Sequence, residues 1–160
     1  MQIHFRPVTE EDREFLYLVY AGTREEELAV TGWRDAEKAA FLWSQFEAQS
    51  LHYQEHFSGA SFHVILRDGE SVGRLYVDRR RDEIRIIDIA LLPRVRGQGI
   101  GSRILSDILT EAEGAGLPVR IHVEMNNPAM RLYRRLGFRS VAVHGVYLLM
   151  ERPTQPGLVS

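Results

Sequence analysis

The spacing of apolar residues divides the chain into a mainly helical first third and a following run of strands and helices. Apolar positions recur every three or four residues between 35 and 56, which predicts one long amphipathic helix. A shorter helix is expected after residues 9–12, whose Thr-Glu-Glu-Asp sequence forms a weak capping box. Residues 3–6 are expected to form a short strand that ends at Pro7.

Beyond residue 60 the pattern changes to that of strands. Residues 62–67 and 71–78 flank an Asp68-Gly69 pair, which is typical of a tight hairpin. Residues 83–92 are almost continuously apolar, as expected of a central strand covered on both faces. The remaining elements predicted are a helix over 100–115, a strand over 118–124, a short helix over 128–137 and a closing hairpin over 139–150.

This order predicts an α/β (α+β) fold built on a mixed, mostly antiparallel sheet of about six to seven strands. Helices are expected on both faces, with one strand–helix–strand crossover. A chain of 160 residues has the length of one ordinary domain. We expect that domain to span residues 1–152, followed by a C-terminal tail over 153–160.

Composition excludes several function classes. The net charge of −2 and the pI near 6.3 argue against a nucleic-acid-binding surface. The chain has no cysteine, so a disulfide framework, a thiolate nucleophile and a cysteine-based zinc site are excluded. No segment approaches the roughly eighteen consecutive apolar residues of a membrane span, and the first residues lack a signal-peptide pattern. We therefore expect a cytoplasmic protein with no membrane partner.

The glycine-rich turn at residues 94–101, Arg-Val-Arg-Gly-Gln-Gly-Ile-Gly, is the most informative stretch. It joins a strand to a helix, where free backbone N–H groups and the helix dipole favour a phosphate or pyrophosphate. Glycines allow close approach of the backbone to a ligand, and Arg94 and Arg96 add positive charge. A nucleoside-triphosphate loop is excluded, because Ser102 and Arg103 follow the last glycine. The dinucleotide fingerprint is also one residue short.

Two motifs resemble the GNAT superfamily of acetyl-CoA-dependent N-acetyltransferases. Arg96-x-x-Gly99-x-Gly101 is similar to the acetyl-CoA signature of that family. Residues 126–138, Asn-Asn-Pro-Ala-Met-Arg-Leu-Tyr-Arg-Arg-Leu-Gly-Phe, look like its later motif. The resemblance covers residues 61–150 well and the first sixty residues loosely.

The resemblance implies direct transfer of an acetyl group from acetyl-CoA to a primary amine of a small molecule or peptide. It implies that loop amides hold the pyrophosphate and that the preceding strand end binds the pantetheine arm. Tyr133 would protonate the departing thiolate, with core packing as the alternative, and Asn126 would contact the cofactor or cap a helix. The implied cofactor-binding residues are Ala90, Leu91, Leu92, Arg94, Arg96, Gly97, Gln98, Gly99, Ile100, Gly101, Ser102, Asn126 and Tyr133.

The acceptor amine must lose a proton before it attacks, so a base or a water chain is useful. Asp88 stands inside an apolar strand, where burial would raise its pKa towards neutrality. The alternative is a core aspartate paired with Arg74 or His122. Glu83 and Glu124 are weaker candidates, and a solvated charge is the favoured interpretation of Glu83.

Aromatic residues of the helical region and the last hairpin are candidate walls of an acceptor site. The sequence does not choose among an amino acid, a polyamine, an antibiotic and a protein N-terminus, and it leaves a homodimer open. The acidic run at residues 24–27 is interpreted as a solvated helical turn, with steering of a cationic amine as the alternative. The candidate wall residues are Trp33, Trp43, Phe46, Tyr53 and Tyr147.

Two rival functions remain. One is a CoA-binding module without catalysis. The other is a zinc hydrolase, because His52, Glu55 and His56 match the His-x-x-Glu-His pattern of one metallopeptidase class. The simpler interpretation of these histidines is an exposed helix face, and we expect no metal site.

Overall fold

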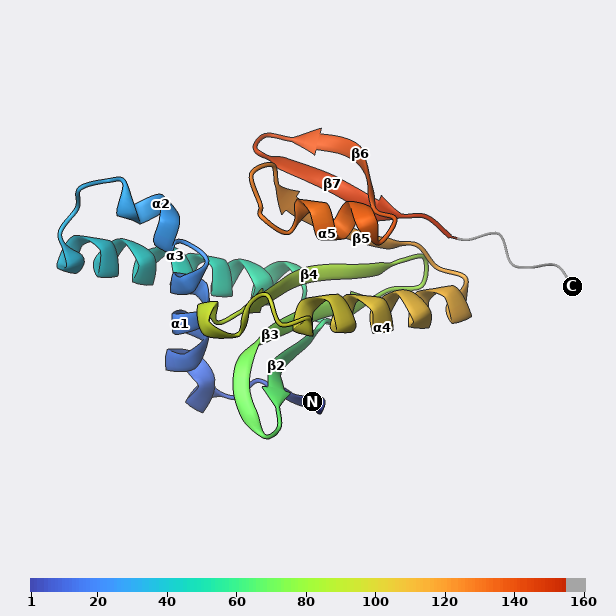
Figure 1. The fold of residues 1–160 in the computed structure, drawn as a ribbon, viewed down its shortest axis with the longest axis horizontal. Coiled ribbons are helices and arrows are strands. Elements are labelled where there is room, and N and C mark those ends of the chain that lie inside the picture. Colours follow the sequence, from blue (N-terminus) through green and yellow to red (C-terminus); the bar gives the residue numbers. More distant parts are fainter. Residues whose placement is uncertain (155–160) are drawn as a thin grey trace, which may run out of the picture. The chain divides into compact units, whose positions relative to one another are not determined.

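The computed structural model describes residues 1–154, so residues 155–160 of the expected tail lie outside the described part. The strands join in one seven-stranded sheet of order β1-β2-β3-β4-β5-β7-β6 (Figure 1). The strands are β1 (Ile3–Pro7), β2 (Ser61–Arg67), β3 (Glu70–Arg79), β4 (Ile84–Leu91), β5 (Val119–Glu124), β6 (Arg139–His144) and β7 (Tyr147–Arg152). The helices are α1 (Arg13–Gly22), α2 (Glu25–Ala29), α3 (Asp35–His56), α4 (Ile100–Ala115) and α5 (Met130–Arg135), with 3-10 turns η1 (Glu10–Asp12) and η2 (Pro93–Val95).

The chain divides into two compact units. The first contains residues 1–76 and 88–98, and the second contains residues 77–87 and those from 99 onward. Strands β3 and β4 run through both units, since each has one end in the first unit and the other end in the second.

In the first unit, β1 pairs antiparallel with β2 and helix α1 packs against α3. The β2–β3 hairpin turns at Asp68 and Gly69, which have φ values of 51° and 85° as a tight hairpin requires. Apolar side chains of the three helices meet in one cluster because they recur on one face of each helix. That cluster consists of Leu16, Tyr20, Leu28, Leu42 and Phe46.

In the second unit, β4 runs parallel to β5, starting from the pair of Ile84 with Val119, and α4 forms the crossover between them. Strand β7 pairs antiparallel with both β5 and β6. Helix α4 ends at Gly116, whose φ of 70° is the left-handed conformation common after a helix. The buried stripe of α4 consists of Ile100, Ile104, Leu105, Ile108, Leu109 and Ala112.

The expected fold class is confirmed, because the chain forms a mixed seven-stranded sheet with a helical crossover. Helix α3 occupies the predicted residues, whereas α5 begins at Met130 rather than at Pro128. The amide of Ala129 donates to the side chain of Asn127 at 2.8 Å, which forms a turn before the helix. No helix within residues 1–154 is both long and apolar enough to cross a membrane.

Candidate active site

The glycine-rich turn has the backbone conformation that its sequence predicts. Gly97 and Gly99 have φ values of 74° and 84°, which side-chain-bearing residues rarely adopt. Gly99 is the N-cap of α4, so the first amides of that helix follow it directly. A Cβ added to either glycine would meet no atom within 4 Å, so the backbone is open there to a ligand.

The two arginines of this turn have different surroundings. The Nε of Arg96 donates to the carbonyl of Leu91, the last residue of β4, at 3.2 Å. Arg94 instead forms an ion pair with Glu70 of β3 at 2.7 Å, with both side chains more than half exposed. The expected positive charge at Arg94 is therefore partly offset, although an exposed pair of this kind contributes little stability.

Gln98 connects the turn to neighbouring residues. Its side-chain oxygen accepts a hydrogen bond from Arg67 at the end of β2, and its Nε2 donates to the carbonyl of Arg94 at 3.3 Å. The sequence did not indicate the contact of Arg67 or that of Glu70, because both come from the β2–β3 hairpin, 31 and 24 residues from their partners along the chain.

Two glycines outside the turn allow close packing beneath it. A Cβ at Gly73 on β3 would overlap the carbonyl oxygen of Ala90 on β4. A Cβ at Gly22, the last residue of α1, would lie 2.8 Å from Cδ of Pro93. Since β4 ends and the glycine turn begins beside these contacts, both glycines set the backbone position of expected cofactor-binding residues. No local sequence pattern points to Gly22 or Gly73.

Asp88 lies on β4 within a group of partly buried polar side chains in the first unit. Its Oδ2 lies 2.6 Å from Nη2 of Arg74 on β3 and accepts a hydrogen bond from the hydroxyl of Tyr53 on α3 at 3.0 Å. Of the two pairings considered for this aspartate, the structure shows the one with Arg74. The Asp88 side chain retains 15% exposure, so solvent still reaches it.

The two residues that contact Asp88, Tyr53 and Arg74, have raised pKa values. Burial raises the pKa of Tyr53 and the negative charge of Asp88 raises it further, so this phenol stays protonated and donates. Burial alone would lower the pKa of Arg74, but the attraction of Asp88 together with Tyr76, Tyr53 and the hydrogen bond to Asp88 outweighs it, and the pKa is raised. The group is therefore a buried ion pair with one phenolic hydrogen bond.

In the second unit, Tyr133 lies on α5 and is only 4% exposed. Its ring meets that of Phe138 edge to face, with centroids 5.7 Å apart. Asn126 is exposed just before the helix, and the turn-forming side chain is that of Asn127. The role of Tyr133 as an acid and the cofactor contact of Asn126 stay predictions.

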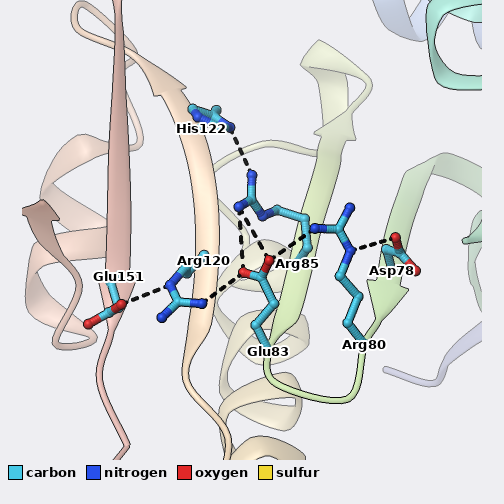
Figure 2. Close-up of polar contacts among 7 residues, drawn as sticks. All are labelled: Asp78, Arg80, Glu83, Arg85, Arg120, His122 and Glu151. Atoms are coloured by element: carbon cyan, nitrogen blue, oxygen red, sulfur yellow. Dashed lines mark hydrogen bonds and ion pairs between the residues drawn. The ribbon is translucent and has the colours of Figure 1, made fainter. Parts of the chain in front are cut away.

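Glu83, the second candidate base, forms the centre of an ionic network in the second unit (Figure 2). Its carboxylate lies 3.0 Å from Arg80, 3.4 Å from Arg85 and 3.2 Å from Arg120. Glu83 is 6% exposed, so the expectation of a solvated charge is wrong. Burial alone would raise the pKa of Glu83, but Arg85 and Arg120 outweigh it and lower the pKa. A carboxylate so stabilised is poorly suited to accept a proton.

His122 belongs to the edge of the same network. Nη1 of Arg85 lies 3.0 Å from Nδ1 of His122, and this ring nitrogen accepts because a guanidinium only donates. Burial first, then the charges of Arg85 and His144, lower the pKa of His122. The same ring is thus neutral near pH 7 and occupied at Nδ1.

The five aromatic candidates for acceptor walls differ in exposure. Trp33 and Tyr147 are 40% and 41% exposed, and Trp43 is 37% exposed. Phe46 is 2% exposed and belongs to the core cluster, so it presents almost no surface to a substrate. Tyr53 directs its hydroxyl to Asp88. Acceptor binding by these five residues stays a prediction.

The possible metal motif lies on an exposed part of α3. The rings of His52 and His56 lie 4.4 Å apart, and both residues are exposed, as is Glu55. Within residues 1–154 no group of three or more acidic, histidine or cysteine side chains is placed to hold a metal ion. The geometry therefore gives the zinc-hydrolase alternative no support.

Comparison with known proteins adds to this local geometry. The model of the acetyltransferase (GNAT) family matches residues 23–138. Mycothiol acetyltransferase of Streptomyces coelicolor is 33% identical over 51% of this chain and 28% of that protein. Histone acetyltransferase MCC1 of Arabidopsis thaliana is 32% identical over 54% of this chain and 38% of that protein. The chain thus spans less than two fifths of the length of these curated relatives.

The fold also has solved counterparts. The PaiA N-acetyltransferase of Thermoplasma acidophilum, solved in complex with coenzyme A, superposes with a TM-score of 0.70 at 18% identity. That alignment covers 96% of this chain and 99% of the other, and at such identity it shows the fold alone. Because the family model matches most of the chain, including the glycine turn and Tyr133, the protein belongs to the GNAT acetyltransferase family.

Proposed function

We propose that this protein is an N-acetyltransferase that moves the acetyl group of acetyl-CoA to a primary amine. The observation that carries the proposal is the open glycine turn, where Gly97 and Gly99 hold positive φ values directly before the first amides of α4. A helix N-terminus with accessible amides suits a pyrophosphate. Membership of the family supports the same cofactor.

In this proposal the backbone amides of residues 97–102 hold the pyrophosphate and the end of β4 binds the pantetheine arm. Acetyl-CoA supplies the acetyl group as an activated thioester. Asp88, or a water chain, takes a proton from the acceptor amine so that its nitrogen can form the new C–N bond. Tyr133 gives its phenolic proton to the sulfur as the C–S bond breaks, and backbone amides stabilise the oxyanion between these two events. No acetyl-enzyme forms.

Asp88 is a better candidate base than Glu83. Its side chain is 15% exposed and meets one arginine, whereas Glu83 meets three arginines and is more deeply buried. A proton acceptor must be reachable by the amine and must not be held too firmly in its charged form. The acceptor itself stays open among small molecules and peptides, and a cytoplasmic location and a homodimer stay predictions.

A thermal-shift titration tests the cofactor. Saturation at about one hundred times the dissociation constant should add about 2.7 kcal/mol to the free energy of unfolding. Gly99→Asp should remove this shift, because its carboxylate would face the pyrophosphate. Gly99→Asn is the matched control, since it imposes the same backbone strain without the charge, so it should retain more of the shift. A melting curve unchanged by millimolar acetyl-CoA would contradict the proposal.

A thiol-release assay with spermidine, an aminoglycoside and a peptide with a free N-terminus separates catalysis from binding alone. An acetyltransferase should release the CoA thiol in the presence of at least one amine. Cofactor-dependent stabilisation without release for any amine would favour the alternative of a non-catalytic CoA-binding module.

A further inference from the structure

We propose that Arg74 and Tyr53 are positioning residues that hold the Asp88 carboxylate with one oxygen bound and the other turned to the acceptor amine. This inference rests on the proposed role of Asp88 as the base, and it concerns side chains of the first unit alone. It gives Tyr53 a role other than that of an acceptor wall.

The two contacts of Asp88 fall on the same atom. Nη2 of Arg74 and the hydroxyl of Tyr53 lie 2.6 Å and 3.0 Å from Oδ2. An ionised carboxylate has two oxygens and about four acceptor sites. Within residues 1–154 the contacts of this side chain thus occupy Oδ2, and Oδ1 is the oxygen left for an amine proton. Two donors on one oxygen also fix the rotation of the carboxylate.

Arg74 is buried and contacts Gln49 and Tyr76 as well as Asp88. It is 2% exposed, its Nη2 also donates to Oε1 of Gln49 at 2.8 Å, and its guanidinium lies 5.2 Å from the ring centroid of Tyr76. The Nε of Arg74 is buried without a hydrogen-bond partner in the described part of the chain. An incompletely bonded, buried cation depends strongly on its one counter-charge, Asp88, so the pair is mutually constrained.

The phenol of Tyr53 is a hydrogen-bond donor that stays protonated near neutral pH. Burial and then the charge of Asp88 raise the pKa of its phenol, so Tyr53 keeps its proton and cannot act as a base. Its ring packs edge to face on Tyr76 with centroids 5.7 Å apart, which fixes the direction of the hydroxyl. A buried phenol directed at a carboxylate serves orientation better than it serves acceptor binding.

The contacts of Arg74 and Tyr53 with Asp88 should affect how the activity depends on pH. The polar groups that face Asp88 are Arg74 and Tyr76 from β3 and Tyr53 from α3, whereas Gln49 of α3 contacts Arg74. Arg74 carries the one positive charge among them, and a nearby positive charge or a donated hydrogen bond favours an ionised carboxylate. Loss of either partner should therefore change the environment of the carboxylate and the pH dependence of a reaction that uses it.

The first test measures this directly by carbon-13 NMR of side-chain carboxyl groups, with the Asp88 signal assigned from Asp88→Asn. Arg74→Gln should move the Asp88 carboxyl signal at pH 7 away from its wild-type position, because the positive charge beside the carboxylate is lost. Tyr53→Phe should move it in the same direction by less, and Arg74→Lys, which keeps the charge, should restore most of the change. Tyr20→Phe is the control, because Tyr20 is a phenol of the core cluster in the same unit. An Asp88 carboxyl signal unchanged in both Arg74→Gln and Tyr53→Phe would overturn the inference.

The second test follows kcat/KM against pH with spermidine and the free-N-terminus peptide as acceptors. The acidic limb should move to higher pH in Tyr53→Phe, while KM for acetyl-CoA stays within about twofold. If Arg74→Gln does not fold, Tyr53→Phe still decides the matter. A limb lost in Asp88→Asn yet unmoved in Tyr53→Phe would overturn the positioning role alone. A wild-type limb in Asp88→Asn would overturn Asp88 as the base, and this inference with it.

Discussion

Gly73 on β3 and Ala90 on β4 approach so closely that a methyl group at position 73 would overlap the carbonyl oxygen of Ala90. The same added atom would lie 2.9 Å from a side-chain carbon of Leu91. Both neighbours belong to the strand end that is expected to bind the pantetheine arm. A residue with no expected contact to the cofactor thus sets the position of residues that have one.

Gly73→Ala should therefore weaken acetyl-CoA binding by roughly tenfold or more, about 1.4 kcal/mol, because backbone rather than a flexible side chain must move. Isothermal titration of acetyl-CoA measures the effect. Gly59→Ala is the control, since a Cβ there meets nothing within 4 Å. Equal affinity in the two variants would show that the strand end tolerates the displacement.

Gly22→Ala should disturb the start of the glycine turn, since its methyl group would meet Cδ and Cγ of Pro93 at 2.8 Å and 2.9 Å. In a free helix the same change would stabilise by about 1 kcal/mol. Adding Pro93→Ala removes both contacted atoms and should recover stability and cofactor affinity. Urea unfolding and acetyl-CoA titration of the two single variants and the double variant measure this coupling, expected at about 0.5–3 kcal/mol. Strictly additive effects would refute it.

Tyr133→Phe tests the general acid. The ring should keep its packing against Phe138 while the proton is removed, so the variant should fold and bind acetyl-CoA normally. Turnover should fall by about 10²–10⁴, the usual contribution of a positioned acid. Tyr20→Phe, a buried phenol of the core cluster, provides the background value. A loss below roughly threefold would mean that water protonates the thiolate.

Asp12 makes folding stability depend on pH. Its hydrogen bond to Arg6, at 2.7–2.8 Å, lowers the pKa of this buried carboxyl from 3.8 to about 2. A lowered folded-state pKa contributes stability that is present above the unfolded value and is lost as pH falls from about 4 to about 2. Asp12→Asn should lower the urea midpoint at pH 7 and flatten its fall over that window. A parallel fall in both proteins would contradict this assignment.

Glu83→Gln should be the most destabilising of these changes, by about 3 kcal/mol, because it leaves the cluster of Arg80, Arg85 and Arg120 without its shared carboxylate. Glu113→Gln is the matched control. Glu113 is about half exposed and pairs with one arginine, Arg152, so its loss should cost less than about 1 kcal/mol. Urea unfolding at pH 7 compares them, and similar losses would mean that the network stabilises no more than a surface pair.

The helices, the strands and the glycine-rich turn could be predicted from the sequence because residues close together along the chain encode them. The apolar period of α3, the Asp68-Gly69 turn and the glycines before α4 each act through local backbone geometry. The start of α5 was placed two residues too early, because Pro128 favours a helix start whereas Asn127 forms a turn.

The candidate catalytic environment depended on tertiary structure. Asp88 was expected to be buried and is partly buried, but the choice of Arg74 over His122 required the register of β3 against β4. Glu83 is paired with Arg120 of β5, although the two residues lie thirty-seven positions apart along the chain. No local pattern specifies such pairs, because they form only when strands distant in sequence align.

Sequence alone therefore determined the order of helices and strands, the glycine-rich turn and the resemblance to the family, all of which follow from local spacing. The tertiary structure decided which charges are paired, which aromatic rings are buried, and where Gly22 and Gly73 permit close packing. The physical reason is that proton affinity and steric fit depend on atoms within a few ångströms, and chain folding alone selects those neighbours.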